Sequence, residues 1–419
     1  MSGQTRRMSP VCTLGPGSGT HMAERKLTLL VPDISAPTIG ASLRIARLLK
    51  QDYDIEITGP DFGAGTCSMY RNAFDWNPVS CPRMYRFPDF FRERRKLANH
   101  IDGDMIIAMK AYANTVPVAL ELKRKRGCGV IVYLDEWDGA LWRDMTPRER
   151  VKQFLHHWHH PLNELYAPWV ERMLPLCDQV ISTTTFLREK FGGHIAPAGV
   201  DTDFFCPQPR EKVARLRREW GLNDAICIGF GGVARPHKGI EPFLDAVVSM
   251  PDLPLKFVVV GPRTPYMERL LAVPEYGGRL VCIGAAEDEK KDINQRVHED
   301  MPGYLAMMDI LVVSLGDTVL AQSQMPIKVY EAMAMEKPVI ATAVSDLPLV
   351  LGDCGWIIGS RDVSGIRDVV RKILLHADEA NRRARAAREK CVTQFDEKIV
   401  RKRWVGLLED VYCTCCRVR

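Results

Sequence analysis

A glycine-rich stretch at residues 229–239, GFGGVARPHKG, contains the residue types of an anion-binding turn. Its glycines, among them Gly232, let the backbone approach a ligand closely, and a helix that begins after the stretch offers unpaired N–H groups. Arg235 and Lys238 add positive charge. We therefore predict a diphosphate site, although the spacing is neither GxxxxGK[ST] nor GxGxxG. A glycine turn with two solvated cations is the alternative interpretation.

A second stretch, SQMPIKVYEAMAMEKPVIAT at residues 323–342, has the pattern of a ligand-binding helix start. Pro326 lies near the beginning of the helix, so the amides of Ile327 and Lys328 lack helical partners and can face an anion. Glu331 follows Ile327 by one helical turn, and its carboxylate can accept hydrogen bonds from two ribose hydroxyls. A charged residue on the helix surface is the alternative.

These stretches belong to a chain in which short apolar runs alternate with helical segments, the pattern of a parallel sheet wrapped by helices. In the first half we predict a helix at 40–50, a long helical stretch at 147–175, and strands at 28–32, 54–58, 105–109, 130–134 and 179–183. In the second half we predict helices at 210–220 and 239–250, and strands at 225–230, 255–261, 279–284, 309–313 and 338–342.

The proline-rich turn at residues 206–209 predicts a hinge between two doubly wound, Rossmann-like domains that face each other across a cleft. We assign residues 27–207 to the first domain and 208–394 to the second. Residues 395–419 are predicted to form a helix that returns toward the first domain, followed by a tail, and residues 1–26 are a disordered leader outside the fold.

Composition excludes several classes of protein. The chain has 419 residues, 46% of them apolar and 26% charged, with a net charge of +5, so it is neither disordered throughout nor a basic nucleic-acid arm. No apolar run approaches the roughly 18 residues of a membrane span. The 13 cysteines are mostly scattered singly through apolar segments, which favours reduced thiols in a cytoplasmic protein.

The order of motifs resembles the retaining GT-B glycosyltransferases of family 4, also called glycosyl transferases group 1, over nearly the whole chain. The resemblance rests on APAGVDTDFF (196–205), VARPHKG (233–239), VVVGP (258–262), PGYLAMMDILVV (302–313), PIKVYEAMAMEKPVIAT (326–342) and CGWIIG (354–359). It implies a GT-B fold whose second domain binds a nucleotide-diphosphate sugar and whose first domain binds the acceptor.

The resemblance also implies roles for single residues of the second domain. Lys238 would contact the donor diphosphate together with the amides of Ile327 and Lys328, and Glu331 would hold the ribose. The chain departs from the family at two positions. Val233 stands where the family commonly has an arginine, which Arg235 is hypothesised to replace, and Ser323 stands where the first glutamate of the E-x7-E pair is expected.

In the first domain the family often carries a histidine near the transferring sugar, and this chain has Asp135 and Glu136 there. Either carboxylate could orient an acceptor hydroxyl or stabilise positive charge at the anomeric carbon. The alternative is a strand-end turn built on Asp138 and Gly139. Gly40 lies at the first strand-to-helix turn, where the family places small residues near the sugar and phosphate, and a simple flexible turn is its alternative.

Two further patterns are interpreted as surface features. His156 and His160 share a helix face without the glutamate of HExxH, and we interpret them, with His157 and His159, as part of a polar aromatic face near the acceptor entrance. The basic runs at 92–96 and 123–126 fit solvated helix faces or, alternatively, docking on an anionic membrane.

We predict that the chain is a retaining glycosyltransferase that uses a nucleotide-diphosphate sugar as co-substrate, with no metal and no other cofactor. The acceptor is a glycan, a lipid-linked molecule or a small molecule, and no nucleic acid binds. The location is cytoplasmic, with possible peripheral contact at the inner membrane face. A nucleotide-sugar epimerase or hydrolase of the same architecture, and a non-catalytic nucleotide-sugar-binding subunit, are the alternatives.

Overall fold

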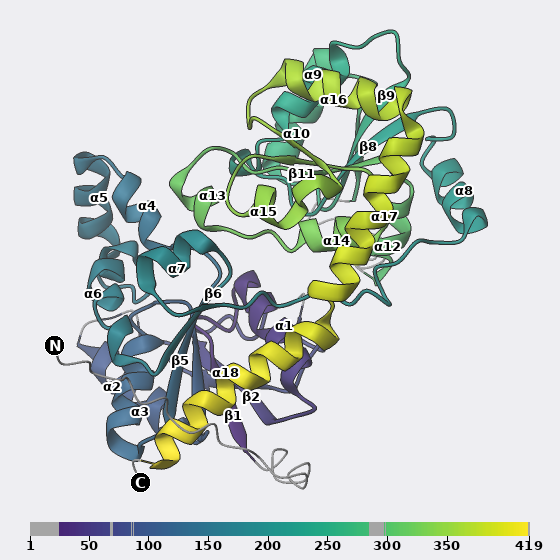
Figure 1. Cartoon of the computed structure of the whole chain (residues 1–419). Coiled ribbons are helices and arrows are strands. Elements are labelled where there is room, and N and C mark those ends of the chain that lie inside the picture. Colours follow the sequence, from purple (N-terminus) through teal and green to yellow (C-terminus); the bar gives the residue numbers. More distant parts are fainter. Residues whose placement is uncertain are drawn as a thin grey trace, which may run out of the picture.

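The computed structural model describes residues 25–67, 70–84, 86, 88–284, 297 and 299–417. These residues form two domains, each built on a parallel sheet with helices on both faces (Figure 1). The predicted fold class of two doubly wound domains is thereby confirmed. The predicted leader lies almost entirely in residues 1–24, which are outside the described residues; Lys26, its last residue, already begins the first strand.

The sheet of the first domain has the strand order β3-β2-β1-β4-β5-β6-β7 among the described residues, with every pair parallel. Its central strands are buried at every position because helices cover both faces. The strands are β1 Lys26–Leu30, β2 Asp54–Asp61, β3 Trp76–Ser80, β4 Met105–Met109, β5 Gly129–Leu134, β6 Gln179–Ser182 and β7 His194–Ile195.

The sheet of the second domain has the order β10-β9-β8-β11-β12-β13 in the described part of the chain, again with parallel pairing. Its strands are β8 Ile226–Gly231, β9 Leu255–Val260, β10 Leu280–Ile283, β11 Ile310–Val313, β12 Val339–Thr342 and β13 Trp356–Ile358. In both sheets the strand order reverses beside a central strand. Ligands bind at such a point, beyond the carboxyl ends of the strands.

The helices of the first domain are α1 Gly40–Leu49, α2 Asp89–His100, α3 Val116–Arg126, α4 Gly139–Asp144, α5 Pro147–His157, α6 Ala167–Glu171 and α7 Thr185–Phe191. The later helices are α8 Arg210–Glu219, α9 Glu241–Val248, α10 Pro265–Leu271, α12 Met301–Ala306, α13 Val319–Ser323, α14 Lys328–Ala334, α15 Leu347–Leu351, α16 Val363–Leu375, α17 Ala377–Gln394 and α18 Glu397–Arg417.

Two predicted helices differ from the structure. The stretch at 147–175 is not one helix, because α5 ends at His157 and a turn follows before Pro161, a residue that disfavours helical backbone at the position before it. The predicted helix at 239–250 begins only at Glu241, since Gly239 has a φ of +61° and closes the short 3-10 turn η5 Pro236–Lys238.

Helix α18 lies along the first domain, although α17 immediately before it packs on the second (Figure 1). Trp404 of α18 is fully buried, its indole N–H donates to the carbonyl of Pro197 at 2.9 Å, and its ring lies 5.5 Å from that of Tyr133. Arg25 pairs with Glu409 of α18 at 2.6 Å. The helix continues through Arg417, the last described residue, and the predicted tail beyond it stays a prediction.

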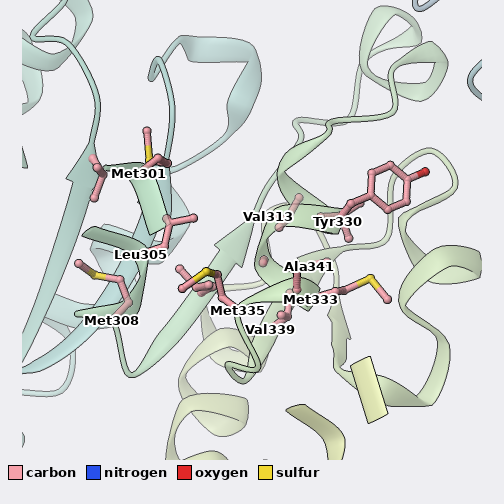
Figure 2. Packing of buried hydrophobic residues seen from close by; sticks show 14 of the residues in the cluster. Met301, Leu305, Met308, Val313, Tyr330, Met333, Met335, Val339 and Ala341 are labelled. Carbon is pink, nitrogen blue, oxygen red and sulfur yellow. The ribbon is translucent and has the colours of Figure 1, made fainter. Parts of the chain in front are cut away.

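A methionine-rich part of the hydrophobic core packs against α14. Figure 2 shows Met333 and Met335, at the end of α14, packed toward β11 and β12, with Met301, Leu305 and Met308 nearby. A Cβ on Gly229 would lie 2.6 Å from the sulfur of Met308, so this glycine serves packing between β8 and the α12 segment rather than the approach of a ligand. The core therefore holds the C-terminal end of α14 in place.

Candidate active site

A cleft of about 180 Å³ lies between the two domains. The first domain contributes Asp135 and Glu136, which follow β5, together with Arg44 of α1. The second domain contributes Lys238 of η5 and Ile327 at the start of α14. Further lining residues are Tyr133, Thr183, Pro197, Ala198, Gly199, Gln324, Met325, Pro326 and Tyr330. The predicted cleft is therefore present, and four of the predicted site residues line it.

The wall from the first domain is a cluster of carboxylates around one buried cation. Lys110, the residue after β4, forms ion pairs with Glu136, with Asp138 at 3.1 Å and with Asp135 at 3.4 Å. The hydroxyl of Tyr112 donates to Asp138 at 2.7 Å. Because β4 and β5 are parallel neighbours, their carboxyl ends bring these side chains to one edge of the sheet.

The wall from the second domain meets this cluster through Gln324. The side-chain amide nitrogen of Gln324 donates to Glu136, and its oxygen accepts a hydrogen bond from Lys238 at 3.1 Å. A continuous polar chain therefore joins Lys110, Glu136, Gln324 and Lys238 across the cleft. The neutral glutamine amide lies between a carboxylate and an ammonium, and this fixes which of its ends carries the nitrogen.

Burial shifts the pKa values of the charged groups in the cleft. Burial lowers the pKa of Lys238, and the charge of Arg235 lowers it further, while Glu136 opposes both. Burial alone would raise the pKa of Glu136, but the Lys110 ammonium and the hydrogen bond from Gln324 outweigh it, so the pKa is lowered. Burial raises the pKa of Asp138 to about 6 despite Lys110.

The predicted ribose and phosphate residues gather at the start of α14. Lys328 pairs with Glu331 at 2.9 Å, and a Cβ on Gly232 would lie 3.2 Å from the Cε of Lys328. Gly232 has a φ of +120°, a conformation that favours glycine. The first two turn bonds of the helix are donated by Val329 and Tyr330, so the amides of Ile327 and Lys328 precede them.

The family comparison decides the assignment of this half of the chain. Residues 225–376 match the model of the family described as "Glycosyl transferases group 1". The second domain is a glycosyl transferases group 1 domain. The match contains the glycine-rich stretch, η5 and α14, which are the segments that carry Lys238 and Glu331.

Solved structures extend the similarity to both domains. The chain resembles Alr3699/HepE of Anabaena in complex with UDP, with a TM-score of 0.68 and 14% identity over 92% of this chain and 100% of that one. Sucrose-phosphate synthase from Thermosynechococcus elongatus has a TM-score of 0.67 and 17% sequence identity over 93% of this chain and 100% of that one. A glycosyltransferase from Rickettsia africae has a TM-score of 0.69 and 13% sequence identity over 93% of this chain and 99% of that one. These neighbours confirm the GT-B fold. No curated protein sequence matches the chain.

Six of the predicted residues do not line the cleft: Gly232, Lys328 and Glu331, described above, and Ser323, Arg235 and Gly40. Ser323 is fully buried between the domains, where its hydroxyl accepts from the amide of Trp137 at 2.8 Å and its carbonyl accepts from Thr184 at 3.3 Å. Arg235 is exposed at the start of η5. Gly40 begins α1, and a Cβ there would lie 2.8 Å from the hydroxyl of Tyr70.

Sequence reasoning missed Lys110, Gln324 and Arg44. A signal for Lys110 existed, because a lysine directly after the apolar strand MIIAM must lie at the carboxyl edge of the sheet. Gln324 lies next to Ser323, within the stretch already singled out. Arg44 had no comparable signal, since an arginine on an amphipathic helix is most often a solvated surface residue.

The remaining sequence features lie outside the cleft. Helix α5 has no buried residue, and His160 packs its ring 5.6 Å from that of Phe62. Within the described ranges, no group of three or more His, Cys, Asp or Glu side chains is placed to hold a metal ion. Among the helices of the described residues, none is long and apolar enough to cross a membrane.

The basic runs of α2 and α3 take part in the packing of the first domain. Arg94 pairs with Glu121 at 2.5 Å, Lys123 pairs with Asp178 at 2.8 Å, and Arg126 donates to the carbonyl of Ile101 at 2.7 Å. These contacts agree with the interpretation of the runs as helix-surface charges. Docking of the two runs on an anionic membrane stays a prediction.

Proposed function

We propose that the protein transfers a glycosyl group from a nucleoside-diphosphate sugar to an acceptor hydroxyl. The observation that carries this proposal is the distribution of charge across one cleft. Cations and free helix-start amides come from the group 1 domain, and carboxylates come from the opposite domain. A diphosphate on one side and a hydroxyl nucleophile on the other match this distribution.

In the proposed reaction Lys238 and the amides of Ile327 and Lys328 hold the diphosphate, and Glu331 accepts from the ribose hydroxyls. Lys238 is half-buried in the cleft, so its attraction to the charge that develops on the leaving diphosphate is screened less than at an exposed site. Arg235 adds positive charge from the rim. Catalysis then consists of positioning and electrostatic stabilisation, with no covalent enzyme intermediate.

The finer parts of the proposal rest on the family resemblance. Transfer occurs with retention of anomeric configuration, needs no metal ion, and uses Asp135 or Glu136 to orient the acceptor. The acceptor is a glycan, a lipid-linked molecule or a small molecule. Buried thiols such as Cys67, Cys81 and Cys128, none of them in a disulfide, support a reducing, cytoplasmic location, with peripheral membrane contact through the basic runs.

Calorimetric titration with UDP, GDP, ADP and dTDP, each with and without magnesium, tests the donor site. UDP is the first candidate because the Anabaena neighbour was solved with UDP and with UDP-glucose. We expect one diphosphate to bind tightest and its affinity to be unchanged by magnesium. Absence of binding by every nucleotide would overturn the proposal.

The reaction itself is tested by incubation with the matching nucleotide sugar and a panel of hydroxyl acceptors. Formation of a glycoside whose anomeric configuration, read by NMR, equals that of the donor supports retaining transfer. Release of free sugar or of an epimer without any acceptor would instead identify a hydrolase or an epimerase. Donor binding without turnover under any condition would identify a binding subunit.

A further inference from the structure

Lys110 occupies a conformation that folding alone does not favour. Its φ is +68°, a left-handed value that is unfavourable for a residue other than glycine. Its side chain is only 6% exposed, and it is surrounded by Asp135, Glu136 and Asp138. One carboxylate would be enough to compensate a buried ammonium. Three carboxylates around one lysine leave an excess of negative charge beside the cleft.

The two carboxylates that reach the cleft have different partners. Both oxygens of Glu136 are engaged by the protein, one by Lys110 and the other by Gln324 of the opposite domain. The Oδ1 atom of Asp135 lies 3.4 Å from the Lys110 ammonium, yet it is buried and accepts no hydrogen bond within the described structure. The Asp135 side chain as a whole is 30% exposed and lines the cleft, so its carboxylate remains open to a hydroxyl donor there.

We propose that Lys110 is a positioning residue that gives the two carboxylates different roles. It holds Glu136 in its contact with the second domain, and it orients Asp135 toward the acceptor hydroxyl. This inference rests on the proposed function and chooses between the two residues that it left as alternatives. Lys110 acts on the transfer step through Asp135, and it does not touch the diphosphate.

Replacement of Lys110 by methionine removes the charge and keeps the length of the side chain. We expect the affinity for UDP near neutral pH to change less than about threefold, and kcat to fall about hundredfold, the scale of a misplaced acid–base group. The low-pH limb of the kcat profile moves to higher pH, because carboxylates without their cation ionise less readily. Lys110→Arg restores part of kcat.

Several charged groups surround the cluster, and the pH profile is interpreted against all of them. Tyr112, Asp135, Glu136 and Asp138 surround Lys110, while Lys238 and Arg44 line the cleft and His237 interacts with Glu136. Lys123→Met is the matched control, because Lys123 also pairs with a carboxylate, Asp178, but lies on α3 away from the cleft. Its kcat profile should superimpose on that of the wild type.

Loss of a buried cation can also unfold the domain, so a second variant is needed. Lys110→Met combined with Asp138→Asn removes one positive and one negative charge and keeps the net charge of the cluster. We expect this double variant to fold and to retain the kcat defect. A kcat profile equal to that of the wild type, or equal losses of UDP affinity and kcat, would overturn the assignment of Lys110.

The roles of the two carboxylates are separated by Asp135→Asn and Glu136→Gln. We expect Asp135→Asn to lower kcat without changing UDP affinity, and Glu136→Gln to change UDP affinity through Gln324 and Lys238. The opposite pattern would reverse the assignment. If no acceptor is glycosylated by the wild type, the proposed function fails on its own. UDP affinity measured against pH then tests Lys110, because its loss should move the pH at which that affinity changes upward by about one unit.

Discussion

Glu136 of the first domain accepts a hydrogen bond from the side-chain amide of Gln324 in the second domain. The other end of the same amide accepts from Lys238 at 3.1 Å, so a single glutamine connects a cation of the second domain with a carboxylate of the first. The neighbouring Ser323 adds a parallel contact, because its hydroxyl accepts from the amide of Trp137 at 2.8 Å. The relative position of the domains is therefore coupled to the residue expected to hold the diphosphate.

Replacement of Gln324 by methionine should weaken the binding of UDP about three- to tenfold, because Lys238 loses a neutral hydrogen-bond partner that orients it. A double-mutant cycle with Glu136→Gln, measured by calorimetry, should give a coupling energy of about 0.5–3 kcal/mol. Gln322→Met is the control. Gln322 lies on α13, which ends one residue before Gln324, and its side-chain oxygen accepts from the amide of Ser345 at 2.9 Å outside the cleft. Additive effects of the two cleft variants would show that the bridge has no energetic role.

Lys238→Ala and Glu331→Ala should each weaken UDP binding by about tenfold to hundredfold, the range for hydrogen bonds that involve a charged group. Lys238 supplies charge to the diphosphate, and Glu331 supplies acceptors to the ribose. His156→Ala on α5 should leave the affinity unchanged, because no residue of that helix is buried or lines the cleft. The comparison is made by isothermal titration at one salt concentration, and wild-type affinity in both the Lys238 and the Glu331 variant would refute the donor site.

The fold was predictable because its periodic signals are local. Apolar runs such as MIIAM and VIVYL are buried on both faces, and β4 and β5 coincide with them within one residue. The edge strand β3 was missed because WNPVS contains a proline and little apolar surface. The break at His157 was missed because the helical pattern continues into a segment where Pro161 prevents the helix from continuing.

The site was predictable only where a residue's role depends on its own strand or helix end. Lys238, Ile327, Asp135 and Glu136 reach the cleft for that reason. The contacts of Lys110 and Gln324 depend instead on how two sheets and two domains meet, and no local pattern contains that information. Ser323 illustrates the same limit: its place in the motif predicted a donor-binding residue, and packing put it against Trp137 in the other domain.

Trp404→Ala should lower the free energy of unfolding by about 3–5 kcal/mol, because the substitution leaves a large cavity and removes the hydrogen bond to Pro197. Ile399→Ala is the matched control on the same helix, since Ile399 is 41% exposed and should change stability by no more than about 0.5 kcal/mol. Denaturant unfolding of both variants makes the comparison. If both substitutions lowered the free energy of unfolding by the same small amount, α18 would not contribute to the core of the first domain.

The burial of Asp138 makes a specific prediction about pH. Its pKa is raised to about 6 in the folded protein, from an ordinary value of 3.8. Between these two values the unfolded chain gives up this proton while the folded chain retains it. The contribution of Asp138 to the free energy of unfolding therefore decreases as the pH rises through this window.

Asp138→Asn removes this titration and keeps an oxygen that can accept from Tyr112 and Lys110. The stability of the variant relative to the wild type should therefore increase by about 1–3 kcal/mol between about pH 4 and pH 7. Urea unfolding at several pH values measures the difference, and Asp144→Asn, an exposed carboxyl of α4, controls for the loss of a surface charge. Carboxyls remote from the Lys110 cluster titrate in the same way in both proteins, so their contributions cancel in the difference. A difference that stays constant or decreases with pH would mean that Asp138 is already ionised when the cleft is folded, and that Lys110 compensates all three carboxylates at once.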